Sequence, residues 1–186
     1  MIICGIDEAG RGPLAGPVFA AAVILDEKNP IESLNDSKKL SEKKLIYLYV
    51  EIKKKSLDFC FSSASVGEID QMNILNASLL AMSRAFNGLK VVPDKILVDG
   101  LYVPKIIGID MHAVVKGDSL IPEISAASIV AKVERDIYMY ELDKLYPQYN
   151  FRQHKGYPTK NHLIQLREHG VIDIYRKSFK PVRDLI

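Results

Sequence analysis

Apolar and polar residues follow one another along the chain in patterns that predict five strands. Two continuous apolar runs, at residues 1–7 and 16–25, are typical of buried strands, and the Gly and Pro residues between them predict a turn. Residues 56–66 alternate between apolar and polar positions and predict a third strand. Residues 94–100 and 109–118 predict two more strands, separated by a short loop.

The helical spacing of apolar residues predicts four helices between and after these strands. Ser41 is suited to cap the first of them, whose last turn is rich in lysine, and Gly88 is expected to end the second in a left-handed conformation. The predicted helices cover residues 41–55, 73–88, 122–146 and 159–170.

The order of these elements predicts an α/β fold. Strands joined by a tight turn pair antiparallel, whereas strands joined through a helix tend to pair parallel, so we expect a mixed five-stranded sheet flanked by helices. The chain has 186 residues, which is the size of one ordinary domain. We therefore expect a single domain over residues 1–186, with a small helical C-terminal region from about residue 150.

Composition narrows the class of protein further. Hydrophobic residues make up 48% of the chain, yet no apolar run reaches the roughly 18 residues that a membrane span needs, and no signal peptide is recognisable. The two cysteines, Cys4 and Cys60, form no metal-binding or redox motif and are expected to be free thiols. We expect a cytoplasmic protein and a monomer without a membrane partner.

The charges are unevenly distributed, although the formal net charge is only +2. Residues 150–186 carry eight basic and three acidic groups, whereas residues 1–149 carry 17 basic and 20 acidic groups. A basic flank beside an acidic body is typical of a polyanion-binding surface next to a metal site, although a solvated basic helix has the same composition.

Acidic residues stand at or just after the ends of three predicted strands. They are Asp7 with its neighbour Glu8, Asp99, and Asp118. Ligands of open α/β sheets gather outside the carboxyl ends of parallel strands, so these acids are expected to converge on one place. Each aspartate alone is also compatible with ordinary turn or capping chemistry.

Glu8 presents a geometric problem, because successive side chains of a strand point to opposite faces. We expect the strand to have broken at this point, with Gly10 and Gly12 supplying the unusual dihedral angles of the turn. Carboxylates that converge repel one another unless a cation lies between them. Oxygen ligands without zinc-like His or Cys spacing favour Mg²⁺ or Mn²⁺, and two such ions about 3.5–4 Å apart are typical of phosphodiester cleavage.

Motifs along nearly the whole chain resemble those of the ribonuclease HII family. They are "GIDEAGRGPLAGPV", "NDSKKLS", "ILVDG", "VVKGD" followed by "ISAASIVAKVERD", and "HKGYPTKNH". The resemblance implies a ribonuclease H-like fold and an endonuclease that hydrolyses the RNA strand of RNA/DNA hybrids. It also implies cutting 5′ of single ribonucleotides in duplex DNA, leaving 3′-hydroxyl and 5′-phosphate ends, as in ribonucleotide excision repair and primer removal during DNA replication.

The same resemblance assigns residues to roles. Asp7, Glu8, Asp99 and Asp118 match the family's catalytic acids, which hold two Mg²⁺ or Mn²⁺ ions. The remaining matches are substrate-binding residues, namely Gly10, Arg11 and Gly12 of the GRG element, Lys38 and Lys39 of the "DSKKL" element, Tyr157 and Thr159 of the "GYPT" element, and Lys160.

Backbone groups at the glycines of the GRG element can approach the ribose 2′-hydroxyl, which is the group that distinguishes RNA from DNA. Arg11 is alternatively a structural partner of the acids, and Tyr157 alternatively a packed loop residue. His154 and His162 lack metal-ligand spacing and are expected to contact phosphate or solvent.

Three alternatives remain at this point. Another nuclease of the same fold, such as a junction resolvase or transposase, would share the metals but lack the GRG and GYPT elements. A ribonuclease HIII-like enzyme is disfavoured by Arg11, by Asp118 and by the start of the sequence at Met1. A non-catalytic nucleic-acid-binding module of the same fold is disfavoured by the acidic cluster, from which a binder of polyanions would gain nothing.

Overall fold

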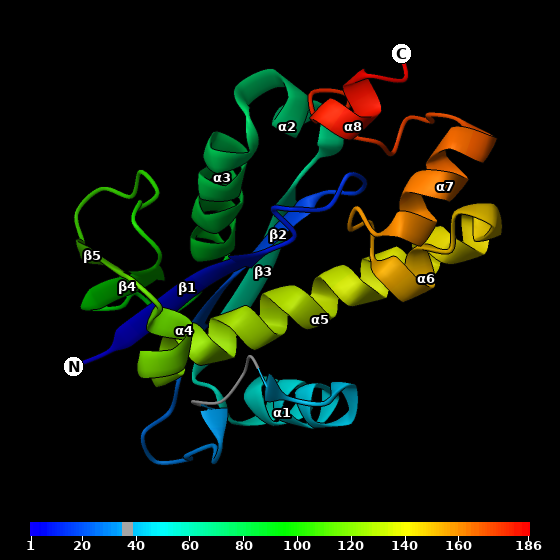
Figure 1. Ribbon diagram of the computed structural model, residues 1–186. Coiled ribbons are helices and arrows are strands. Elements are labelled where there is room, and N and C mark those ends of the chain that lie inside the picture. The colour runs from blue at the N-terminus through cyan, green and yellow to red at the C-terminus, as the bar shows by residue number, and fades with distance from the viewer. Residues whose placement is uncertain (35–38) are drawn as a thin grey trace.

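The computed structural model describes residues 1–34 and 39–186 and contains the predicted mixed sheet of five strands. The strands are β1 (Ile3–Ala9), β2 (Val18–Ile24), β3 (Asp58–Ala64), β4 (Lys95–Asp99) and β5 (Asp110–Val114). Their order across the sheet is β3-β2-β1-β4-β5, in which β1 pairs antiparallel with β2 and parallel with β4 (Figure 1).

Helices surround this sheet and continue beyond its last strand. The longer ones are α1 (Glu42–Lys55), α2 (Val66–Met72), α3 (Ile74–Asn87), α5 (Pro122–Leu145) and α7 (Lys160–His169). Short helical turns are α4 (Gly117–Leu120), the 3-10 turn η2 (Pro147–Tyr149), α6 (Phe151–His154) and α8 (Lys180–Arg183). None of the described helices is long and apolar enough to cross a membrane.

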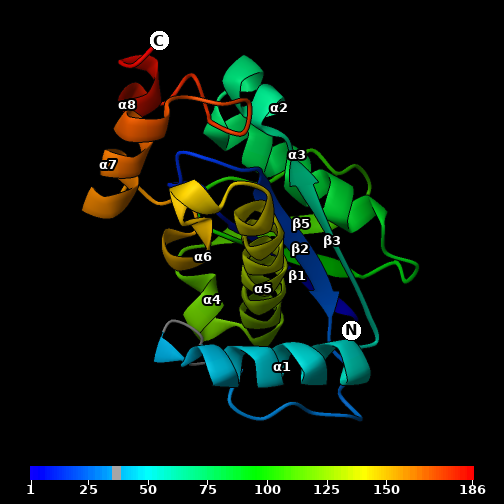
Figure 2. The same cartoon turned by 90° about the vertical axis from the view of Figure 1, so that its right-hand side faces the viewer.

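Strand alternation divides the core between the two faces of the sheet. In β2, Ala20 and Ala22 pack with α2 and α3, whereas Ala21 and Val23 pack with α1 and α5. The two helical layers are visible on opposite sides of the sheet in Figure 2. A third apolar cluster joins the far half of α5 to α7 and the C-terminal segment, and it includes Leu14 from the loop after β1.

Two local expectations are changed by the structure. The Ser41 hydroxyl accepts a hydrogen bond from the Lys44 amide as predicted, but Gly88 ends α3 with a φ of −83° rather than in the left-handed region. A Cβ at Gly88 would lie 2.2 Å from the Cys60 sulfur, so space rather than backbone conformation requires glycine there.

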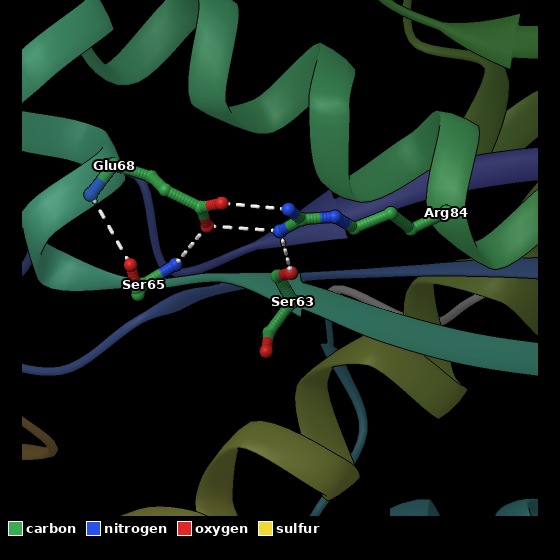
Figure 3. Close-up of polar contacts among 4 residues, drawn as sticks. All are labelled: Ser63, Ser65, Glu68 and Arg84. Carbon is green, nitrogen blue, oxygen red and sulfur yellow. Dashed lines mark hydrogen bonds and ion pairs between the residues drawn. The ribbon is translucent and has the colours of Figure 1, made fainter.

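Helix α2 was not predicted, although its capping box, formed by Ser65 and Glu68, is readable in the sequence as Ser-x-x-Glu. Figure 3 shows this box and the Arg84 side chain that binds the same glutamate. The two cysteines are free, with Cys4 buried in β1 and Cys60 half-buried in β3.

Candidate active site

The first pair of acids lies where β1 leaves its parallel neighbour. β1 pairs with β4 only as far as Ile6 opposite Val98, but it stays paired with β2 up to Ala9 opposite Phe19. The expected strand break before Glu8 is therefore wrong: the antiparallel ladder holds both acids, and the turn begins only at Gly10, whose φ is +92°.

Asp7 is the most strongly perturbed of these acids. Its side chain is buried, and the pKa of its carboxyl is raised well above its usual value, first by burial and then by the charges of Glu8 and Asp99. Hydrogen bonds from the Glu8 amide, 2.8 Å from Oδ1, and from the Ser128 hydroxyl oppose this rise. Burial also raises the pKa of Glu8, and the charge of Arg11 opposes that rise.

Asp118 reaches this edge of the sheet from a helical turn. β5 ends at Val114, so the expectation of a strand extending to Asp118 is wrong, and this residue lies in the first turn of α4. Its backbone amide donates to Oδ1 of Asp99, the last residue of β4, at 3.2 Å. Asp118 is buried. Its hydrogen bond to Asp99 holds it next to the end of β4.

The donor chemistry of these side chains fits a hard divalent cation. Among the described residues, Glu8 Oε2 is buried and has no hydrogen-bond partner, while Oε1 lies 3.7 Å from the guanidinium of Arg11. Mutual repulsion of buried carboxylates and a buried carboxylate oxygen without a donor are what a bound cation would relieve. Within the described ranges, no three or more His, Cys, Asp or Glu side chains lie close enough together to hold a metal ion as they stand.

A cavity of about 350 Å³ opens beside Glu8. The GRG element at residues 10–12 lines it together with Tyr157, whose ring lies 3.5 Å from where a Cβ on Gly12 would be. The remaining lining side chains come from α5, namely Ser128, Lys132, Arg135 and Asp136. Of the two glycines that were predicted to need unusual dihedral angles, only Gly10 has a positive φ.

Of the other predicted substrate-binding residues, the three that the structure describes, Lys39, Thr159 and Lys160, do not line this cavity. Lys38 falls outside the described residues, and Lys39 is exposed beside them. Thr159 caps α7 by accepting a hydrogen bond from the His162 amide, and the exposed Lys160 follows it. Tyr157 is half-exposed, with 45% of its surface accessible, so the alternative of a packed loop residue is not observed.

The two histidines near Tyr157 are buried, which corrects the expectation that they contact phosphate or solvent. Their rings stack with centroids 3.8 Å apart. The Nδ1 atom of His154 accepts from the Gly156 amide, while His162 donates from Nδ1 to the Tyr157 carbonyl and forms a second hydrogen bond between Nε2 and the Tyr175 hydroxyl. The His154 ring is neutral while its Nδ1 accepts this bond, and together the two rings fix the backbone on either side of Tyr157.

We expect this histidine pair to make folding stability pH-dependent. Burial, followed by the charge of His154, lowers the pKa of His162 to about 4 from an ordinary value of 6.5. Between these values the unfolded chain binds a proton that the folded chain does not, so stability falls as the pH falls through this window. Thermal unfolding from about pH 7 to about pH 5 should show a smaller loss of Tm for His162→Asn, whose amide can still donate to Tyr157, than for the wild type. Equal losses would contradict this assignment.

Two further functional candidates, Arg135 and Arg176, were missed by sequence reasoning. Both are buried beneath the GRG element, and Arg176 had been counted with the basic surface of the C-terminal region. A charged residue in a polar stretch predicts exposure, so the sequence contains no local signal for their burial.

Comparison with solved structures places this fold among ribonucleases H of type 2. The crystal structure of the ribonuclease H2 from Pyrococcus horikoshii OT3 superposes with a TM-score of 0.85 at 29% identity, covering 100% of this chain and 97% of that one. The sheet, its flanking helices and the acids at its edge thus define an enzyme of the ribonuclease H class.

Sequence comparison gives the family. The sequence model of the family described as Ribonuclease HII matches residues 4–182. The ribonuclease HII of Vibrio parahaemolyticus serotype O3:K6 is 59% identical over 182 residues, covering 98% of this chain and 86% of the relative. That of Alteromonas mediterranea is 58% identical over 185 residues, covering 100% and 97%. The chain belongs to the ribonuclease HII family and is an endonuclease of the ribonuclease H type.

Proposed function

We propose that this protein hydrolyses the RNA strand of RNA/DNA hybrids and cuts 5′ of single ribonucleotides in duplex DNA, leaving 3′-hydroxyl and 5′-phosphate ends. The observation that carries the proposal is the position of four acids, Asp7, Glu8, Asp99 and Asp118, around the ends of β1 and β4, beside a cavity walled by the GRG element. Such cleavage would serve ribonucleotide excision repair and primer removal.

The four acids are the proposed ligands of Mg²⁺ or Mn²⁺, with two ions during the reaction. When bound, the cations supply an activated water and a polarised phosphodiester. The chain's own contribution is to hold the carboxylates at one edge of the sheet. The buried oxygen of Glu8 and the raised pKa of Asp7 support this assignment, because both features are costly without a cation.

Substrate recognition is assigned to the walls of the cavity. Arg11, whose side chain is 47% exposed, can reach the phosphate backbone although it also lies near Glu8. Tyr157 offers a ring on which a nucleotide sugar can pack, and Gly12 faces it without a side chain of its own. The proposed partners are therefore RNA/DNA hybrids and DNA duplexes containing ribonucleotides.

The region from about residue 150 is proposed to position the duplex within a single catalytic domain spanning residues 1–186. Exposed basic groups of this region, such as Lys160 and Arg167, support the role, whereas Arg176 is excluded from it by burial. A monomer acting in the cytoplasm completes the proposal.

Cleavage mapping tests the proposed function directly. The purified protein would be incubated with end-labelled DNA duplexes carrying one ribonucleotide, with continuous RNA/DNA hybrids and with all-DNA duplexes, each in Mg²⁺, in Mn²⁺ and in chelator. We expect metal-dependent cutting of the hybrid, cutting on the 5′ side of the single ribonucleotide and no cutting of DNA. If only continuous hybrids were cut, the role of Arg11 and Tyr157 in recognising a single ribonucleotide would be refuted. If neither the hybrid nor the single-ribonucleotide duplex were cut, a non-catalytic binding module would be favoured.

A further inference from the structure

Two buried guanidinium groups bind the loop between β1 and β2 from the protein interior. Arg176 and Arg135 are 0% and 2% exposed, respectively. Each donates three hydrogen bonds, and every acceptor of these bonds is a backbone carbonyl oxygen. Buried arginines more commonly face carboxylates, so this arrangement calls for an explanation.

Arg176 binds the GRG element itself. Its Nη2 donates to the Gly10 carbonyl at 2.6 Å, its Nη1 to the Arg11 carbonyl at 3.0 Å, and its Nε to the Gly16 carbonyl at 2.9 Å. The planar fork of a guanidinium reaches all three oxygens at once, which a lysine ammonium cannot match in geometry. The beginning and the end of the loop are thus fixed to one side chain.

Arg135 joins the end of this loop to the segment before Tyr157. It donates to the Ala15 and Pro17 carbonyls at 3.0 and 3.2 Å and to the Lys155 carbonyl at 2.8 Å. It also packs against Gly10 so closely that a Cβ there would lie 2.1 Å from its Nε. Both walls of the cavity therefore depend on the same guanidinium.

The carbonyl bonds of Arg176 determine where the neighbouring amides point. The peptide groups that follow Gly10 and Arg11 are planar and trans, so each N–H points opposite to its carbonyl. The amides of Arg11 and Gly12 accordingly point away from the guanidinium, and both residues line the cavity. A cation on the carbonyl side polarises a peptide group and strengthens its N–H as a donor.

This arrangement has an energetic cost, because both guanidinium groups are removed from water without a carboxylate among the acceptors of these hydrogen bonds. Burial lowers the pKa of Arg135 to about 10, and burial together with the charge of Arg135 lowers that of Arg176 to about 9. Arg84 provides a contrast, because it is half-exposed and binds Glu68 through two hydrogen bonds of 2.8 and 2.6 Å (Figure 3).

We propose that Arg176 and Arg135 are positioning residues for ribonucleotide discrimination. They hold the carbonyls of the loop toward the two guanidinium groups so that the Arg11 and Gly12 amides are presented as donors to the 2′-hydroxyl of the substrate. Arg135 also fixes the backbone two residues before Tyr157 through the Lys155 carbonyl. The inference rests on the proposed function, because it concerns how the same site recognises a ribonucleotide.

The test compares Arg176→Lys, Arg176→Met and the wild type on two substrates. For each protein, kcat/KM is measured on a DNA duplex with one ribonucleotide and on a continuous RNA/DNA hybrid, where many ribose contacts are available. We expect Arg176→Met to lower the ratio of kcat/KM on the single-ribonucleotide duplex to kcat/KM on the hybrid by about tenfold, which corresponds to the net contribution of about one hydrogen bond. Arg176→Lys should behave like Arg176→Met, because it keeps the charge but not the fork.

Controls separate this inference from the proposed function and from folding. Arg84→Met removes an arginine of the α3 surface and should leave the ratio unchanged. A wild type that cuts no single-ribonucleotide duplex would refute the proposed function, whereas an active wild type with an unchanged ratio in both Arg176 variants would refute only this inference. A wild-type kcat/KM ratio in Arg176→Lys would overturn the geometric role of the guanidinium fork. Failure of both variants to fold would show that Arg176 has a structural role alone, and this outcome would also overturn the proposal.

Discussion

Asp7→Asn is expected to abolish cleavage while the protein remains folded and still binds its duplex. Asp7 lies among buried carboxylates, so an amide of the same shape preserves packing but removes the charge that a divalent ion requires. Loss of a direct ligand should reduce kcat by more than the roughly 100-fold limit of changes in the surrounding shell. Single-turnover cleavage in Mg²⁺ and in Mn²⁺ measures the loss, and duplex binding is measured in chelator.

The same substitution should raise the Tm of the metal-free protein. Burial and the charges of Glu8 and Asp99 disfavour an ionised Asp7 at neutral pH, and the amide is free of this penalty. For a chain of this length each kcal/mol of relief raises Tm by about 2–4 °C. Asp110→Asn, at the exposed start of β5, is the matched control. It should change neither the cleavage rate nor the Tm of the metal-free protein. Normal turnover by Asp7→Asn would refute the metal assignment.

Gly5→Ala is expected to be among the most destabilising single-methyl changes in this chain. Gly5 faces α5 so closely that an added Cβ would lie 2.1 Å from the Glu123 carbonyl carbon and 2.3 Å from the Ile124 amide nitrogen. Backbone atoms of a helix cannot move aside as a side-chain end can, so α5 would have to shift away from β1. We expect a loss of about 3 kcal/mol or more in the free energy of unfolding.

Urea denaturation monitored by circular dichroism measures this loss, with Gly12→Ala as the matched control. A Cβ at Gly12 would meet only the Tyr157 ring, at 3.5 Å, and its φ is not positive, so its stability should change by less than about 1 kcal/mol. A shift of α5 would also displace Ser128, which hydrogen-bonds to Asp7, so reduced cleavage should accompany the lost stability. Equal stability of the two variants would contradict the close-contact explanation.

The sheet and the acids were predictable because their signals are local. An apolar run that ends on a carboxylate before glycine indicates a buried strand and places an acid at its carboxyl end, as in residues 95–99. The GRG element was found through a family resemblance, which carries information that one sequence does not contain. Gly10 and Tyr157, which that resemblance assigns to substrate binding, both line one cavity, and their roles stay a prediction.

The misplaced predictions concern residues whose setting is decided by distant parts of the chain. Arg176 reads as a surface charge, yet its partners are 160 or more residues earlier in the sequence. His162 reads as a polar residue of an amphipathic helix, but Tyr175 and a stacked His154 bury it. Tertiary contacts of this kind outweigh local polarity, and no periodicity reports them.

The link between Arg176 and Gly10 also bears on the order in which the protein becomes active during its synthesis. A ribosome releases the acids at the start of the chain first, and the sheet can assemble once residue 114 has emerged. The loop beside those acids obtains its last three hydrogen bonds only when residue 176 follows. A partly made chain that ends before residue 176 thus lacks the side chain that fixes the carbonyls of Gly10, Arg11 and Gly16, so this loop becomes ordered later than the sheet beside it.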